Sequence, residues 1–195
     1  MKPIETQDIL DLTAYERIRD DFVQKTIALK RPRRIHVGRI LCFIFENRDT
    51  VLFQIQEMTR AERTVKEEGI AEEVRVYNEL IPDEYGLSAT LMIEIPNSAE
   101  IRPQLDRLVG IDEHVYLDVG DQSVRASFDE DQFEESRISA VQYVKFPLGE
   151  KLAAAFRDPN VSVALRVDHP NYSEKTLIEG DTRASLAADL ADDVQ

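Results

Sequence analysis

Hydrophobic positions in the first part of the chain recur at helical spacing. Apolar side chains three or four positions apart predict an amphipathic helix over residues 13–30, which Pro32 ends. The same spacing predicts a helix over residues 50–68, stopped by Gly69, and a further helix over residues 70–81. Three main helices are therefore expected before residue 82.

Hydrophobic positions in the rest of the chain recur mainly at strand spacing. Residues 36–46 are apolar on both faces, which predicts a strand covered from both sides. Residues 87–95 alternate, so one face of that strand is hydrophobic and the other polar. A hairpin is predicted around Gly120-Asp121. Further strands are expected at residues 113–119, 124–128, 138–146, 161–168 and 174–178, and shorter helices at residues 6–12, 98–109, 150–156 and from Asp181.

Helices gather early in the chain and strands late, which favours an α+β fold over an alternating βαβ fold. No internal repeat or linker divides the sequence, so we expect a single α+β domain over residues 1–195. In this domain the N-terminal helices pack on a mixed, mostly antiparallel sheet of about six or seven strands. Residues 191–195 are expected to fray as an acidic C-terminus.

Acidic residues outnumber basic ones. The chain has 38 Asp and Glu against 24 Lys and Arg, a formal net charge of −14. Nucleic-acid affinity depends largely on Lys and Arg that neutralise phosphates, so no nucleic-acid partner is expected. The basic run over residues 30–34 is interpreted as a solvated helix end, with cations near the C-terminal end of the helix dipole.

Cysteine usage and hydropathy predict the compartment. Cys42 is the single cysteine, which fits a reducing environment, and its apolar neighbours predict a buried, inert thiol. The N-terminus lacks an apolar signal core. No apolar run approaches the roughly 20 residues that span a bilayer. A cytoplasmic protein without a membrane partner is therefore expected.

One carboxyl group falls on a hydrophobic helix face. A helix that starts near residue 50 places Glu62 on its apolar stripe. A carboxyl group buried there needs a partner, a proton or a ligand. We expect an arginine partner, with Arg48 as first choice and Arg34 or Arg39 as second.

Other ionisable groups gather near Glu62 in the sequence. Together they give a candidate functional cluster of Glu46, Arg48, Glu57 and Glu62. Carboxylates on a helix can bind metal when histidines join them, but the Glu-x-x-His spacing is absent and the three histidines are scattered. No metal site and no cofactor are therefore assigned.

Familiar catalytic patterns are missing from the sequence. Asp168 and His169 are adjacent on a predicted strand, so their side chains point to opposite faces, and His169 is interpreted as a turn histidine. The sequence contains no Gly-x-Ser-x-Gly elbow, no Walker pattern and no glycine-rich phosphate loop. The sequence alone therefore assigns no reaction and leaves the oligomeric state open.

Several segments together resemble a known family. The chain is similar over nearly its whole length to the uncharacterised bacterial domain-of-unknown-function family 3501. Genes of that family often lie beside genes for rubrerythrin-like and cysteine-rich iron–sulfur proteins, so the resemblance implies a link to redox or peroxide-stress chemistry. It supplies no catalytic residues. The segments that carry it are residues 46–58, 77–80, 87–91 and 137–143.

Two functional hypotheses follow. The first is a non-catalytic accessory or interaction protein, with a rubrerythrin-like or iron–sulfur redox protein as its partner. The chain itself cannot hold an iron–sulfur cluster, because such a cluster usually needs four thiolates. The alternative is a small enzyme or metal-binding protein that uses the carboxylate and arginine cluster around Glu46.

Overall fold

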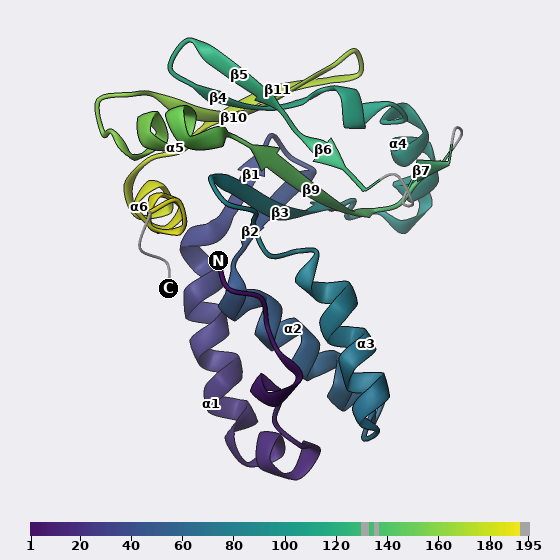
Figure 1. Cartoon of the computed structure of the whole chain (residues 1–195). Coiled ribbons are helices and arrows are strands. Elements are labelled where there is room, and N and C mark those ends of the chain that lie inside the picture. Colours follow the sequence, from purple (N-terminus) through teal and green to yellow (C-terminus); the bar gives the residue numbers. More distant parts are fainter. Residues whose placement is uncertain (130–132, 135–136, 192–195) are drawn as a thin grey trace.

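Three long helices form the lower half of the molecule in Figure 1. The structure is a computed structural model that describes residues 1–129, 133–134 and 137–191. Helices α1 (Leu12–Lys30), α2 (Arg48–Ala61) and α3 (Glu67–Asn78) lie side by side, with α2 in contact with both others. Side-chain caps mark the start of two of them, since Asp11 accepts hydrogen bonds from the first turn of α1 and Asn47 accepts one from the N–H of Thr50 in α2.

Two antiparallel sheets form the upper half. A five-stranded sheet has the order β1-β2-β3-β9-β6, and a four-stranded sheet has the order β11-β10-β4-β5. A short ribbon pairs β7 with β8. The strands are β1 (Arg34–Val37), β2 (Leu41–Glu46), β3 (Gly86–Ile93), β4 (Val115–Val119), β5 (Gln122–Arg125), β6 (Ser127–Phe128), β7 (Phe133–Glu134), β8 (Arg137–Ile138), β9 (Val141–Pro147), β10 (Val163–His169) and β11 (Tyr172–Leu177).

Shorter helices connect and cover the sheets. Helix α6 lies beside the upper end of α1 in Figure 1, and α5 packs against the four-stranded sheet in contact with β4. Four single turns of 3-10 helix complete the described elements. The helices are α4 (Ile101–Arg107), α5 (Gly149–Arg157) and α6 (Gly180–Asp189), and the turns are η1 (Thr6–Asp8), η2 (Arg31–Arg33), η3 (Ser98–Glu100) and η4 (Ile111–Glu113).

The main hydrophobic core fills the space between the two sheets. Phe43 and Phe45 of β2 and Leu91 of β3 meet Leu117 of β4 and Leu165 of β10 there, all fully buried. A second cluster joins the helices, built from residues such as Val51 and Ile55 of α2 and Val74 of α3. Alternation along each strand places the remaining side chains of the five-stranded sheet on its opposite face, toward the helices.

The α+β class predicted from the sequence is confirmed, with two differences of detail. The strands divide between two sheets, where a single sheet was expected. Residues 36–46 form two strands instead of one, because Gly38 adopts a positive φ of 66° and turns the chain between β1 and β2. The C-terminal segment predicted to fray lies outside the described residues except for Ala191.

Helix α2 ends earlier than predicted. The expected stop was Gly69, but the helix ends at Ala61, and Arg63 takes a left-handed φ of 54°. The N–H of Thr64 donates to the carbonyl of Thr59, and the N–H of Arg63 donates to that of Arg60. This arrangement is a Schellman cap, built here on a residue other than glycine.

The length and hydropathy of a helix decide whether it can span a membrane. Among the described residues, no helix is both long enough and apolar enough to cross a bilayer.

Candidate functional site

The outer face of the five-stranded sheet carries polar side chains in cross-strand rows. We use "outer face" for the side turned away from the core between the sheets. One row pairs Glu46 of β2 with Ser88 of β3 and Lys145 of β9. A neighbouring row includes Thr90 of β3 and Tyr143 of β9. Because β2 and β3 are central strands, helices can bury these polar groups at the centre of the molecule.

Glu46 is the buried carboxyl group of this face. Its side chain is 2% exposed at the last position of β2. Thr90 donates a hydrogen bond to its Oε1 at 2.8 Å, and the Nζ of Lys30 lies 3.7 Å from its Oε2. Oε2 accepts no hydrogen bond from the described residues. A buried carboxyl oxygen without a hydrogen bond is costly, and the nearby charge of Lys30 offsets part of that cost.

A pocket of about 490 Å³ opens beside Glu46. We call it the Glu46 pocket. Its volume falls within the range of roughly 300–1,000 Å³ that is common for small-molecule sites. The end of α3 and the loop after it form one wall, and β3, β6 and β9 form the other. Its lining includes Glu46, Tyr77, Glu79, Ser88, Phe128 and Tyr143.

The electrostatics of the Glu46 pocket are acidic. Among the described residues, Glu46, Glu79 and Asp129 line it together with Lys145, and Lys30 pairs with Glu46 from outside the lining. Burial, followed by the nearby charges of Glu46 and Asp129, raises the pKa of the Tyr143 hydroxyl. Burial also raises the pKa of the Tyr77 hydroxyl, with contributions from Tyr143 and neighbouring carboxylates. The pocket thus combines aromatic rings, protonated phenols and carboxyl groups, which is the chemistry that suits a cation.

The other members of the predicted cluster make separate contacts. Arg48, the first residue of α2, forms an ion pair with Asp8 at 2.6 Å. Glu57 accepts a hydrogen bond from the Tyr15 hydroxyl at 2.7 Å and pairs with Arg19 through two nitrogens at 2.8 and 2.9 Å. Hydrogen bonding from Arg19 lowers the pKa of Glu57 despite partial burial. These contacts tie α2 to η1 and to α1.

The prediction for Glu62 is wrong. Its side chain is exposed at the C-cap of α2, and no ion pair joins it to a cation in the described part of the chain. Val65, three residues further along the chain, is 73% exposed. The buried side of α2 runs through Val51, Ile55 and Thr59 instead, and the helix ends before it reaches Glu62. Of the predicted cluster, Glu46 alone lines the pocket.

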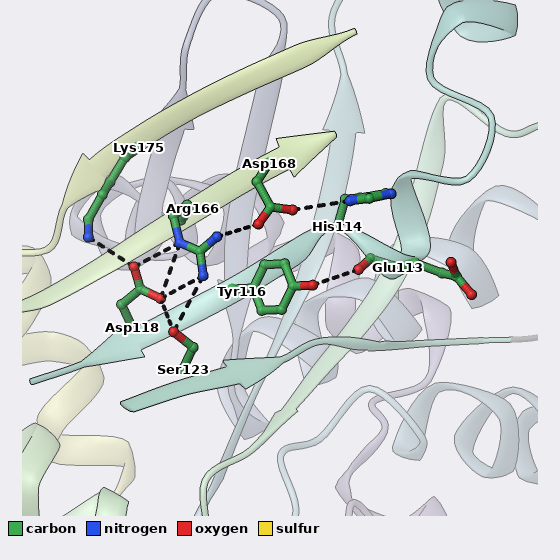
Figure 2. Close-up of polar contacts among 8 residues, drawn as sticks. All are labelled: Glu113, His114, Tyr116, Asp118, Ser123, Arg166, Asp168 and Lys175. Atoms are coloured by element: carbon green, nitrogen blue, oxygen red, sulfur yellow. Dashed lines mark hydrogen bonds and ion pairs between the residues drawn. The ribbon is translucent and has the colours of Figure 1, made fainter. Parts of the chain in front are cut away.

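A second polar cluster lies on the four-stranded sheet (Figure 2). Figure 2 shows the guanidinium of Arg166 between two carboxylates, Asp118 at 3.0 Å and Asp168 at 2.5 Å. Lys175 and Ser123 also bind Asp118, at 2.9 and 2.7 Å. Burial raises the pKa of Asp118, but these hydrogen bonds outweigh it and lower the pKa to about 2. Every carboxylate of this network has a cationic partner, so we interpret it as a structural network.

The two histidines near this network have different roles. His114 lies 3.1 Å from Asp168, across the sheet. His169, adjacent to Asp168 in sequence, points to the other face of β10, where its Nε2 lies 3.0 Å from the carbonyl oxygen of Val109. Asp168 is exposed and His169 is buried, as the predicted alternation requires, but His169 ends strand β10 and is not a turn residue, and its ring centroid lies 5.2 Å from that of His114. The contact between Asp168 and His114 was missed. Only strand pairing brings those two residues together.

A solved structure and a family model match this chain. A search of curated proteins found no match. A crystal structure at 1.90 Å resolution of a novel protein of unknown function from Burkholderia pseudomallei K96243 superimposes with a TM-score of 0.91. It shares 36% sequence identity, and the match covers 97% of this chain and 100% of that one. The model of the family described as "Protein of unknown function (DUF3501)" matches residues 3–190, which confirms the resemblance seen in the sequence. The chain therefore belongs to the DUF3501 family.

Proposed function

We propose that the protein is a binding protein that receives a small amine-bearing molecule in the Glu46 pocket. The observation that carries this proposal is the Oε2 atom of Glu46, buried beside the pocket without a hydrogen bond. An ammonium group offers three N–H donors and a positive charge, and so matches this carboxyl oxygen.

The walls of the pocket favour the same ligand class. Tyr77, Phe128 and Tyr143 offer aromatic rings to the organic part of the molecule. Aromatic rings attract cations through their electron-rich faces, by roughly 0.5–2 kcal/mol per contact. Lys145, the cation of the lining, lies 3.4 Å from Asp83, which offsets part of its repulsion. The ligand class is therefore a small, partly apolar amine.

Isothermal titration calorimetry with matched probes tests this proposal. 1-Aminobutane carries the ammonium group, and 1-butanol is its neutral counterpart. We expect the amine to bind and the alcohol to bind at least about tenfold more weakly, because one lost charge-assisted hydrogen bond is worth about 1.5–3 kcal/mol. Equal binding of the two probes, or no binding of either, would refute the proposal.

Two variants should change the affinity for the amine in opposite directions. Glu46→Gln keeps the shape of the side chain and removes its charge, so amine affinity should fall about tenfold. Lys145→Ala removes the repelling cation, so amine affinity should rise by roughly twofold to fivefold. Glu84→Gln changes an exposed carboxyl group outside the pocket and serves as the control, with affinity unchanged. Thermal unfolding of each variant verifies that the fold is kept.

The sequence resemblance suggests a setting for this binding activity. We further propose an accessory role beside a rubrerythrin-like or iron–sulfur redox system. With a single cysteine the chain cannot supply the four thiolates of a cluster, so any such cluster belongs to a partner. Affinity purification from the native host tests this role. Recovery of a rubrerythrin-like or iron–sulfur protein is the expected result, and recovery of the chain alone would contradict it.

A further inference from the structure

Strand pairing brings three potential metal ligands together at the far end of the outer face. His36 of β1 lies opposite Cys42 of β2, and Glu94 follows directly after β3. The N–H of Glu94 donates to the carbonyl of Ile40 at 2.7 Å, which holds this residue beside the β1–β2 turn. One ligand atom from each of the three side chains lies within 4.8 Å of the other two.

The spacing is close to that of a tetrahedral metal centre. With Zn–N, Zn–S and Zn–O bonds of about 2.0–2.3 Å, tetrahedral ligand atoms lie roughly 3.3–3.6 Å apart. The Nε2 of His36 and the Oε2 of Glu94 already lie 3.5 Å apart. For the sulfur pairs, which lie within 4.8 Å, side-chain movements of about 1 Å would close the site.

The burial of the ligands leaves one side open. Cys42 is fully buried and forms the floor of the group. The side chains of His36 and Glu94 are 51% and 43% exposed, so they face solvent. Arg34 contacts the Oε1 of Glu94 at 4.0 Å, and His36 contacts the other carboxyl oxygen, Oε2. Three protein ligands with an open fourth position are typical of catalytic zinc sites.

The types of the three ligands determine which metal ions the site prefers. A thiolate is a soft ligand and an imidazole is borderline, a combination that suits zinc or ferrous iron and not magnesium or calcium. We propose that His36, Cys42 and Glu94 bind one divalent transition metal ion of this borderline class. The site lies four residues from Glu46 along β2, about 13 Å at the rise of a strand. It therefore stands independently of the proposed amine pocket.

Titration of the full chain with Co²⁺ tests the site, because the absorption spectrum of bound cobalt depends on the atoms that coordinate it. A thiolate ligand adds a charge-transfer absorption band, and tetrahedral geometry gives strong visible bands. We expect one cobalt ion per chain with both signals, displaced by Zn²⁺ and not by excess Mg²⁺. Competition between Zn²⁺ and anaerobic Fe²⁺ then ranks the two metals. Cobalt binding without a thiolate band, or no binding, would overturn the proposal.

Variants assign the signals to residues. Cys42→Ser should abolish the charge-transfer band. His36→Ala changes an exposed side chain, so the fold should persist while cobalt affinity falls at least about tenfold. His114→Ala removes another histidine that contacts a carboxylate, but one outside this group, and should leave affinity unchanged. Equal affinity in the wild type and His36→Ala would overturn the proposal even if Cys42→Ser fails to fold.

Discussion

Arg33 shows how a single residue joins distant parts of the chain. Its side chain is 1% exposed, so the interpretation of the basic run before β1 as solvated is wrong for this residue. It donates to the backbone carbonyls of Phe45 at 2.8 Å and Glu46 at 3.0 Å, and it pairs with Asp189 of α6. This guanidinium therefore links α6 to the end of β2, where Glu46 lines the proposed pocket.

Replacing Arg33 should be costly. Arg33→Met keeps the bulk of the side chain but leaves two carbonyls and Asp189 without their donor, so the free energy of unfolding should fall by about 3 kcal/mol or more. Arg31→Met, in the same basic run but exposed, should change it by less than about 0.5 kcal/mol. Urea denaturation of the two variants measures the difference. Similar stability of both would show that the Arg33 contacts contribute little.

The candidate sites were only partly predictable from the residues. Glu46 was selected because it lies near Glu62 among other ionisable groups, and the structure places it beside the pocket. The group of His36, Cys42 and Glu94 was missed because its members meet through strand register, which local spacing does not encode. The prediction for Glu62 was wrong because it assumed that helix α2 continues past Arg63.

At the scale of elements, the β1–β2 hairpin depends on one glycine. Gly38 has a positive φ of 66°, and a Cβ atom there would overlap the hydroxyl of Tyr172. That hydroxyl donates to the carbonyl of Val37 at 2.7 Å and accepts from the N–H of Arg39 at 2.9 Å. These two hydrogen bonds hold the β1–β2 hairpin against β11 of the four-stranded sheet.

The hairpin yields a matched pair of substitutions. Gly38→Ala and Gly110→Ala both place a side chain at positive φ, at a cost of roughly 1 kcal/mol each. Gly110 has open space around it, whereas Gly38 has the Tyr172 ring. We expect Gly38→Ala to lower the free energy of unfolding by at least about 1 kcal/mol more than Gly110→Ala. Equal losses in thermal denaturation would contradict this role for Tyr172.

Element types were more predictable than their ends and partners. The alternation over residues 87–95 predicted β3 well, because the alternation of hydrophobic and polar side chains is local, although the structure buries both faces of the strand. The number of sheets was not predictable, since nothing local states which strands pair. The end of α2 was missed for a related reason. Arg63 takes a left-handed conformation that sequence rules reserve for glycine or asparagine.

For the whole molecule, the network around Asp118 predicts a response to acid. Its folded pKa of about 2 lies below the ordinary value of 3.8, so its contribution to stability is complete above about pH 5 and is lost as pH falls toward 2. That contribution is roughly 2 kcal/mol. Asp118→Asn should therefore destabilise the protein at pH 7, and its difference from the wild type should shrink as pH falls.

Chemical denaturation at several pH values measures this effect. Asp20→Asn replaces an exposed aspartate of α1 for which no ion pair is found among the described residues, so it serves as the control. A difference between Asp118→Asn and the wild type that stays constant from pH 7 to about pH 2 would contradict the role of the network.

The net charge gives a second prediction for the whole molecule. At −14, the field of the protein repels a polyanion, and Arg33, part of its one basic run, is buried. A gel-shift assay at physiological salt should detect no binding of DNA or RNA. Micromolar affinity at that salt would show that a local surface outweighs the overall charge.

The central claim is that the Glu46 pocket receives an amine, and nuclear magnetic resonance can locate such a ligand directly. In a titration of the isotopically labelled chain with 1-aminobutane, the account predicts that the backbone signals of Glu46, Ser88 and Tyr143 shift together and saturate. It also predicts that the same titration of Glu46→Gln leaves them nearly unchanged. Saturable shifts elsewhere in the molecule, or equal shifts in Glu46→Gln, would contradict the account.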